Sequence, residues 1–294
     1  MKVNGVTIRR SYFETPTMDD RKWAKIPEIP ADVFYADMED SVPPSLKEKA
    51  REKVVELIKN PEHFGGREFI CRTNNLNSPW GREDLEAMAE AHAPFVLYPK
   101  VRDTDEMHEV MEILHRHGAT PEVMLIIETP QAILHLEEIA SVPGVAGLAF
   151  GPGDFALETG VSLLDGDESF TDGMLYARTK THVVARALQL ESVEGMFLAN
   201  LKDLETVRRL AHRSRLFGFS GVMVFYPSHV PIINESRTPR PEEVAWSQRV
   251  VEAFEEARAR GQGAITLDGR WLTVHQFTAA QQDLAIAKAL GLTG

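Results

Sequence analysis

Short apolar runs alternate with helical patterns eight times along this chain, and this alternation constrains the fold more than any other feature. Most runs are nearly continuous in Val, Ile, Leu and Phe, which is typical of parallel strands covered on both faces. The eight predicted strands are residues 10–16, 32–39, 69–74, 95–100, 123–129, 145–152, 190–195 and 221–227. Strand followed by helix, repeated eight times, predicts an α/β fold: an eight-stranded parallel β/α (TIM) barrel. An open, doubly wound parallel sheet is the alternative.

The segments between the predicted strands carry the 3.6-residue periodicity of amphipathic helices. Pro, Asp or Thr residues near their starts are typical helix-entry residues. The clearest predicted helices are residues 44–59, 80–93, 104–118, 170–188 and 202–214. Residues 1–230 are therefore expected to form a barrel domain in which helices surround the sheet.

The pattern changes after the last predicted strand. Residues 237–263 read as a helix that begins at a proline, residues 265–274 contain the Asp-Gly signal of a β-hairpin, and residues 275–291 read as a second amphipathic helix. Residues 231–294 are therefore expected to form a C-terminal helix–hairpin–helix extension. It would pack at the mouth of its own barrel or on a neighbouring subunit.

Composition excludes several classes of function. The chain carries 44 acidic and 32 basic side chains, a formal charge of −12, so neither a nucleic-acid partner nor a basic membrane-binding surface is expected. Cys71 is the only cysteine, which excludes an intrachain disulfide and a multi-cysteine metal site. No apolar run is long enough to span a membrane, and the N-terminal segment lacks the pattern of an export signal. We therefore expect a cytoplasmic location.

Candidate site residues are the polar side chains that end the predicted strands, because active sites of β/α barrels lie at the carboxyl ends of the strands. These residues are Glu14, Asp37, Glu39, Asp40, Arg72, Asn74, Lys100, Glu128, Asp154 and Glu194. Glu14 is expected to lie in a loop, and a role for Glu194 is an open possibility. Any one acid at such a position can equally be a helix cap or a solvated loop residue.

Carboxylates that meet on one rim repel each other unless a cation lies among them. Oxygen ligands without Cys or His favour a hard ion, Mg²⁺ with Mn²⁺ as an alternative, over zinc. Glu128 and Asp154, which end neighbouring strands, are the predicted ligands, and they would leave positions open for water and a chelating substrate. Gly153 lies in the turn before Asp154, where backbone N–H groups could approach an anion.

Two cationic residues among the candidates have alternative interpretations. Arg72 inside a barrel needs a carboxylate, either from the substrate or from Glu39 or Asp40. Lys100 could form a Schiff base with a keto acid, although an ion pair is the more common role of a lysine at a strand end. Cys71, next to Arg72, points to the other side of its strand and is expected to be buried.

The order and spacing of short motifs cover nearly the whole chain. They are R-R-S-Y-F (9–13), A-D-M-E-D-S-V-P-P (36–44), K-E-K-A-R (47–51), C-R-T-N-N-L-N-S-P-W (71–80), Y-P-K-V (98–101), I-I-E-T-P (126–130), F-G-P-G-D-F (150–155), Y-A-R (176–178), P-S-H (227–229) and G-Q-G-A-I-T-L-D-G-R (261–270). Together they resemble the HpcH/HpaI aldolase and citrate lyase β-subunit family, which includes malyl-CoA and citramalyl-CoA lyases.

The resemblance implies a β/α barrel, usually a homo-oligomer such as a trimer or hexamer. It implies that Glu128 and Asp154 bind Mg²⁺ and that Arg72 holds the carboxylate of a 2-keto acid. Asp37, Glu39 and Asp40 match the acidic rim that orients substrate or metal-bound water. We therefore expect Glu39 and Asp40 to act with Arg72 in catalysis. Asp37, Gly153 and Asp154, again with Arg72, are expected to bind substrate.

Three segments depart from the family pattern. Val222 and Tyr226 stand where many relatives carry a lysine and a histidine, and Thr273 stands where some relatives carry a catalytic aspartate. Val193 and Glu194 replace the usual I-D near the seventh strand. The first two departures concern recognition of a thioester more than recognition of a keto acid.

The expected activity is that of a Mg²⁺-dependent carbon–carbon lyase. Its substrate would be a 3-hydroxyacyl-CoA or a related hydroxy acid, and its product a 2-keto acid such as pyruvate, glyoxylate or oxaloacetate. Three alternatives stay open. They are a metal-dependent aldolase that acts on free acids without coenzyme A, a Schiff-base aldolase that uses Lys100, and a catalytically silent barrel that binds a keto acid or an acyl-CoA.

Overall fold

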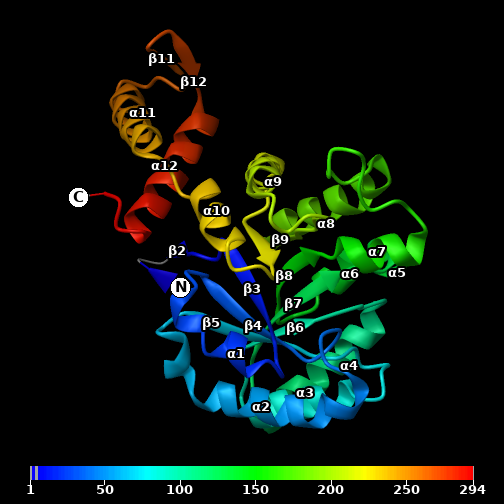
Figure 1. Cartoon of the computed structure of the whole chain (residues 1–294). Helices are drawn as coiled ribbons and strands as arrows, with labels where there is room; N and C mark the ends of the chain where they lie inside the picture. The colour runs from blue at the N-terminus through cyan, green and yellow to red at the C-terminus, as the bar shows by residue number, and fades with distance from the viewer. Residues whose placement is uncertain (1, 4–5, 294) are drawn as a thin grey trace. The chain divides into compact units, whose positions relative to one another are not determined.

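Eight parallel strands close into a barrel in the computed structural model, which describes residues 2–3 and 6–293 (Figure 1). The order of strands around the ring is β10-β3-β4-β5-β6-β7-β8-β9, with β10 pairing back to β3. The strands are β3 (Ser11–Pro16), β4 (Val33–Asp37), β5 (Glu68–Arg72), β6 (Phe95–Tyr98), β7 (Glu122–Ile127), β8 (Val145–Phe150), β9 (Glu191–Gly195) and β10 (Gly221–Val224). The predicted eight-stranded barrel is confirmed, and the open doubly wound sheet is wrong.

Helices follow the strands and cover the outside of the barrel. The α-helices are α1 (Asp20–Trp23), α2 (Lys47–Lys59), α3 (Gly81–Glu90), α4 (Thr104–His115), α5 (Pro130–Leu134), α6 (Leu136–Ala140), α7 (Pro152–Thr159), α8 (Leu175–Ala187), α9 (Leu204–Phe217) and α10 (His229–Ser236). Short 3-10 helices are η1 (Ile26–Glu28), η2 (Pro44–Leu46), η3 (Pro61–Phe64), η4 (Arg116–Gly118) and η5 (Asp172–Met174).

Side chains of the expected types start several of these helices. Asp103 caps α4, Thr129 caps α5 and Asp203 caps α9, each by accepting a hydrogen bond from a backbone N–H in the first turn. Proline begins α5 and α7, where the missing N–H costs no helical hydrogen bond.

The barrel has two apolar layers, and they are separated by the alternation of each strand. One set of side chains fills the interior: Tyr12, Val33, Tyr35, Ile70, Phe95, Leu97, Met124, Ile126, Ala149, Val193 and Met223. The neighbouring residues on the same strands, such as Phe34, Cys71 and Leu125, point outward into the larger core between sheet and helices. Cys71 is buried there, as expected. Apolar side chains therefore fill the interior of this barrel up to the last residues of its strands.

The chain divides into two compact units, residues 9–236 and residues 1–8 with 237–294. The second unit contains α11 (Pro241–Ala259), the hairpin of β11 (Ile265–Leu267) and β12 (Arg270–Leu272), and α12 (Val274–Ala289), together with the short strands β1 (Lys2–Val3) and β2 (Val6–Thr7). The predicted helix–hairpin–helix order is confirmed. Asp268 and Gly269 both have positive φ, as the hairpin turn requires.

The second unit has its own small apolar core. The rings of Phe254 in α11 and Phe277 in α12 stack with their centroids 4.9 Å apart. Thr273 caps α12 and is therefore part of the helix start. In the part of the chain that the structure describes, none of the helices combines the length and the apolar character that crossing a membrane requires.

Leucine substitutions inside and outside the barrel test the interior packing. Leu97 is fully buried in the barrel interior, whereas Leu216 on α9 is 73% exposed. We expect Leu97→Ala to lower the free energy of unfolding by about 2–5 kcal/mol, because it leaves a cavity among packed side chains. Leu216→Ala should change it by less than about 0.5 kcal/mol. Urea unfolding of both variants measures the difference, and equal effects would contradict the assigned packing.

Candidate active site

A polar layer lies directly above the apolar interior of the barrel. Glu14, Asp37, Arg72 and Glu128 each follow an interior side chain by two residues, so all four point into the same space at the carboxyl end of the strands. Glu128 is the first residue beyond β7, and the other three lie on β3, β4 and β5. The strand alternation thus brings three of the predicted site residues together with Glu14, which was expected in a loop.

The Asp37–Arg72 ion pair is the most buried contact of this layer. The β4–β5 register places the two residues side by side, and Arg72 Nε donates to Asp37 Oδ1 at 2.7 Å. Backbone N–H groups of Glu39 and Ser41 donate to the two Asp37 oxygens at 2.8 Å. Burial alone would raise the pKa of Asp37, but the Arg72 charge and the hydrogen bonds of Arg72 and Ser41 lower it to about 2. Asp37 is therefore ionised, and it fixes the guanidinium.

Arg72 also faces the two other acids of the rim. Its Nη1 lies 3.3 Å from Glu39 Oε2 and 3.4 Å from Asp40 Oδ2. The interpretation of Arg72 as an ion-pair partner of Glu39 or Asp40 is confirmed, and the closer partner, Asp37, was missed. Among the described residues, Nη2 has no hydrogen-bond partner. One edge of a buried guanidinium therefore stays available for an anion.

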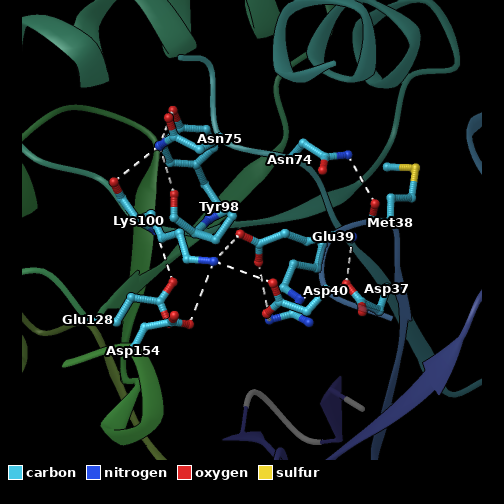
Figure 2. Close-up of polar contacts among 12 residues, drawn as sticks. Asp37, Met38, Glu39, Asp40, Asn74, Asn75, Tyr98, Lys100, Glu128 and Asp154 are labelled. Carbon is cyan, nitrogen blue, oxygen red and sulfur yellow. Dashed lines mark hydrogen bonds and ion pairs between the residues drawn. The ribbon is translucent and has the colours of Figure 1, made fainter. Parts of the chain in front are cut away.

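Lys100 lies between the acidic rim and the end of β7 (Figure 2). Its Nζ is 2.7 Å from Glu39 Oε1, 3.4 Å from Asp40 Oδ1 and 3.6 Å from Asp154 Oδ2. Burial lowers the pKa of Lys100, but the charges of Glu39, Asp40 and Asp154 together with the hydrogen bond to Glu39 raise it well above its ordinary value. A Schiff-base nucleophile needs a neutral amine, so these contacts disfavour that role.

The backbone N–H of Lys100 donates a hydrogen bond to the carboxylate of Glu128. Lys100 has φ 54°, a left-handed conformation that residues other than glycine rarely adopt. In this conformation its N–H donates to Glu128 Oε1 at 3.0 Å (Figure 2). The turn after β6 therefore holds one oxygen of Glu128, while the lysine head group balances the charge of Asp154.

Glu128 and Asp154 lie next to each other (Figure 2). Glu128 is only 3% exposed, and Asp154 lies in the first turn of α7 with its side chain 31% exposed. Burial and the negative charges of Glu39 and Asp154 raise the pKa of Glu128 well above its usual range, against the opposing charges of Arg72 and Lys100. Glu128 thus has no ion pair among the described residues, whereas Asp154 has Lys100 Nζ within 3.6 Å.

Gly151 provides the space that the Glu128 side chain occupies. A Cβ added at Gly151 would lie 2.6 Å from Glu128 Oε2 and 2.8 Å from Glu128 Cβ. The φ of Gly151 is −98°, so space rather than backbone conformation requires glycine here. Gly151, the first glycine of the F-G-P-G-D-F turn, therefore leaves the space that the Glu128 carboxylate occupies.

The donor set of Glu128 and Asp154 fits a hard divalent cation. Both side chains offer carboxylate oxygens, and a cation between them would relieve the repulsion that raises the Glu128 pKa. Nowhere in residues 2–3 and 6–293 do three or more His, Cys, Asp or Glu side chains come together as a metal site. The protein would therefore supply two ligands, and water and substrate oxygens would supply the others.

Lys47 and Asn74 form hydrogen bonds with the loop that carries the acidic rim. Lys47 Nζ donates to the carbonyl oxygens of Met38 and Glu39 at 2.7 and 2.6 Å and to Asn74 Oδ1 at 2.7 Å. Asn74 Nδ2 donates to the same Met38 oxygen at 3.0 Å (Figure 2). Asn74 therefore positions the loop. Lys47 was not among the predicted site residues, because its contacts depend on how η2 and α2 fold back.

Two strand-end acids lie elsewhere than the sequence suggested. Glu194 shares its face of β9 with outward-pointing Ser192, and it pairs with Arg178 of α8 beneath the ring of Phe217. It therefore lies between barrel and helices, outside the mouth. Glu14 lies on β3 and accepts a hydrogen bond from Tyr35 Oη at 2.7 Å. The alternation of each strand was the signal that distinguishes the two.

Gly153 lies in the first turn of α7, beside Asp154. A Cβ added there would have no atom within 4 Å, so the surrounding space is open. Its expected role in substrate binding stays a prediction.

The chain matches the model of the HpcH/HpaI aldolase/citrate lyase family over residues 15–227. It is 32% identical over 283 residues to a (3S)-malyl-CoA thioesterase of Cereibacter sphaeroides, covering 96% of this chain and 95% of that protein. It is 26% identical over 299 residues to the human mitochondrial citramalyl-CoA lyase, covering 96% of this chain and 86% of that protein. Against citrate lyase subunit beta of Leuconostoc mesenteroides it is 27% identical, covering 98% and 96%.

Solved structures of the same architecture include the protein CitE of Mycobacterium tuberculosis in complex with magnesium, acetoacetate and coenzyme A. The TM-score is 0.80 with 23% sequence identity, covering 96% of this chain and 98% of that chain. A citrate lyase of Burkholderia xenovorans gives a TM-score of 0.82 with 18% identity, covering 97% and 93%. These likenesses support the barrel fold.

The Asp37–Arg72 pair makes stability dependent on pH. A pKa lowered from 3.8 to about 2 corresponds to about 2 kcal/mol of stabilisation at pH 7. This stabilisation is fully present above about pH 4 and is lost as the pH falls towards about 2, where the folded carboxylate takes up its proton. We expect Asp37→Asn to lower the free energy of unfolding by at least about 2 kcal/mol at pH 7, and by about half as much at pH 3.

Urea unfolding of wild type and Asp37→Asn across this pH range measures the difference. The matched control is Asp105→Asn, at an exposed position in the first turn of α4, which should cost less than about 0.5 kcal/mol throughout. A difference between wild type and Asp37→Asn that stays constant from pH 7 to 3 would show that the pair is not ionised as described.

Gly151→Ala tests whether Glu128 belongs to a metal site. The added methyl group must displace the Glu128 carboxylate, so we expect Mg²⁺ affinity measured by isothermal titration calorimetry to fall at least about tenfold. Gly166→Ala, where a Cβ would meet no atom within 4 Å, is the control and should bind Mg²⁺ as wild type does. Unchanged affinity in Gly151→Ala would remove Glu128 from the proposed ligands.

Proposed function

The chain belongs to the HpcH/HpaI aldolase/citrate lyase family, and from this premise we propose that it is a Mg²⁺-dependent carbon–carbon lyase. Its substrate would be a 3-hydroxyacyl-CoA or a related hydroxy acid, cleaved in an aldol or Claisen-type reaction that releases a 2-keto acid. Pyruvate, glyoxylate and oxaloacetate are candidate products. The observation that carries this proposal is a buried arginine with one open edge beside two adjacent carboxylates at the mouth of one barrel.

Substrate binding is assigned to Arg72 and its neighbours. The open Nη2 edge of Arg72 would hold the carboxylate of the keto acid, while Asp37 keeps the guanidinium in place through Nε. Gly153 and Asp154 border the same space from the start of α7. A ligand held at two points in this way is oriented before the reaction begins.

Glu128 and Asp154 would hold the metal ion. The chemistry that Mg²⁺ supplies when bound is polarisation of the carbonyl oxygen of the keto acid. Lys100 remains paired with Glu39 and Asp154 and keeps the surrounding carboxylates from repelling each other. Magnesium in the M. tuberculosis CitE complex agrees with this assignment at the level of the fold.

Cleavage also requires a base that accepts the proton of the substrate hydroxyl. Glu39 and Asp40 are the two carboxylates that contact Arg72 Nη1, while Asp37 binds its Nε. Glu39 Oε2 is buried and has no hydrogen-bond partner, so it can accept a proton from a group that lies against Arg72. We therefore assign catalytic roles to Arg72, Glu39 and Asp40.

Thioester hydrolysis is the second candidate function. It is favoured by the relatives named (3S)-malyl-CoA thioesterase, which match this chain over nearly its whole length at 30–32% identity. Hydrolysis would release free coenzyme A and a hydroxy acid, whereas the lyase reaction would release a keto acid and an acyl-CoA. The two functions therefore differ in their products.

Incubation of citramalyl-CoA and malyl-CoA with the full chain, in Mg²⁺ or in EDTA, tests the proposal. A carbonyl reagent detects pyruvate or glyoxylate, and a thiol reagent detects free coenzyme A. We expect Mg²⁺-dependent release of a keto acid without free thiol. Free thiol without keto acid would establish the thioesterase instead, and no product from either thioester would favour an aldolase of free acids or a binding protein.

Variants of the two proposed ligands complete the test. Glu128→Gln and Asp154→Asn keep the size of the side chains but remove their charge, so we expect activity to fall at least about 100-fold in each. Glu138→Gln, on the exposed face of α6, is the control and should leave activity unchanged. Full activity in both ligand variants would refute the metal-site assignment.

A further inference from the structure

Glu14 and Glu128 are the two carboxylates of the mouth layer that have no ion pair among the described residues, and only Glu128 belongs to the proposed metal site. Its Oε2 accepts a hydrogen bond from Tyr35 Oη at 2.7 Å, and its Oε1 has no hydrogen-bond partner within the described part of the chain. No ion pair to Glu14 occurs there either, although its side chain is half-buried inside the barrel. A half-buried carboxylate oxygen that has no donor within the protein is open to a donor on a ligand. This residue is therefore a candidate for ligand binding.

The position of Glu14 relative to the metal site follows from the strand order. β3 and β7 are four steps apart in a ring of eight, so Glu14 lies across the barrel mouth from Glu128. The interior of an eight-stranded barrel is only wide enough for side chains or one small ligand. A small ligand held near Glu128 and Asp154 therefore extends towards Glu14.

Two of the three strands between these two sides, β8 and β9, end in glycine at the level of the mouth layer. Gly151 follows the interior residue of β8 by two positions, and Gly195 does the same on β9. Neither glycine projects a side chain into the mouth. The side chains of Glu128 and Pro152 fill the space beside these two glycines. On β10, Phe225 follows the interior Met223 by two positions and is 42% exposed. Glu14 with Tyr35 forms the polar wall across the mouth from Glu128.

We propose that Glu14 and Tyr35 form a specificity subsite that binds a hydroxyl group on the substituent of the keto carbon. The proposal rests on the proposed function, because the keto acid must be held by Arg72 and the metal ligands for its substituent to reach β3. Glu14 Oε1 accepts the hydrogen bond of that hydroxyl, and Tyr35 keeps the carboxylate in place by donating to Oε2.

The charges around Glu14 select a neutral donor over a charged one. A carboxylate substituent would be repelled by Glu14 and by Asp37, which faces the same space from β4. An ammonium substituent would be attracted by Glu14 but repelled by Arg72, which lies close enough to influence the charge of Glu14. A methyl group would leave Oε1 desolvated and without a partner. A hydroxyl satisfies Oε1 without added charge.

Binding of three keto acids to the full chain in saturating Mg²⁺ tests the subsite. The probes are pyruvate with a methyl substituent, 3-hydroxypyruvate with a hydroxyl, and oxaloacetate with a carboxylate. We expect 3-hydroxypyruvate to bind about tenfold more tightly than pyruvate in isothermal titration calorimetry, which corresponds to about 1.4 kcal/mol. Oxaloacetate should bind more weakly than either.

Two variants assign the preference to Glu14. In Glu14→Leu the preference for 3-hydroxypyruvate over pyruvate should disappear, while pyruvate affinity stays within about twofold of wild type. Glu14→Gln keeps the size and an acceptor oxygen but loses the charge, so an intermediate preference is expected. Glu138→Leu, at an exposed position, should retain the full preference. The ratio of two affinities is insensitive to a general loss of stability.

The outcomes separate this proposal from the function on which it rests. Mg²⁺-dependent binding of pyruvate and 3-hydroxypyruvate with equal affinity in wild type would overturn the subsite and leave the keto-acid site standing. A preference that persists unchanged in Glu14→Leu and Glu14→Gln would also overturn it. Binding of no keto acid in Mg²⁺ would overturn both proposals.

Discussion

The closure of eight parallel strands into one ring is the constraint on which the site depends. In a closed barrel each strand presents alternate residues to a single shared interior, so the residue two positions beyond the apolar filling must enter the same small space as its counterparts. In this chain those positions hold Glu14, Asp37, Arg72 and Glu128. Charged groups that are far apart in sequence are thereby forced together at one mouth, and their mutual interactions decide what can bind there.

The barrel mouth offers one place for a cation, at Glu128, and one place for an anion, at Arg72. Arg72 and Lys100 are the cations that contact the acidic rim, and both share Glu39 and Asp40. Glu128 accepts only one hydrogen bond, from a backbone N–H. A divalent cation would therefore offset the electrostatic cost of burying its charge. Arg72, by contrast, is held through Nε by Asp37 and keeps Nη2 open. A ligand that bears both a carboxylate and a chelating oxygen matches these two requirements together.

Much of this arrangement is predictable from the sequence, because the apolar pattern of strands and the 3.6-residue pattern of helices are both local features of the chain. Continuous apolar runs identified all eight strands, and the residues that end them included Asp37, Arg72 and Glu128. The same alternation separates Glu14, two residues beyond Tyr12, from Glu194, two residues beyond Ser192, but the strand ends alone did not distinguish them.

Contacts that depend on register or on a returning helix were not predictable in the same way. The β4–β5 register makes Asp37 the nearest partner of Arg72, and a sequence without an alignment does not give a register. Lys47 reaches Met38 and Glu39 only because α2 packs back towards the loop that precedes it. The left-handed turn at Lys100 likewise depends on tertiary contacts.

Two of the departures from the family pattern can be placed within their own compact units. Val222, where relatives carry a lysine, is fully buried in the layer between barrel and helices, so it cannot contact a ligand inside the barrel. Thr273, where relatives carry an aspartate, starts α12 in the other compact unit. Glu14, Asp37, Arg72 and Glu128, which form the polar layer of the mouth, all belong to the barrel unit. Differences in substrate choice that arise within the barrel are therefore expected from the mouth layer, in which Glu14 is the carboxylate that has no ion pair among the described residues and is not a proposed metal ligand.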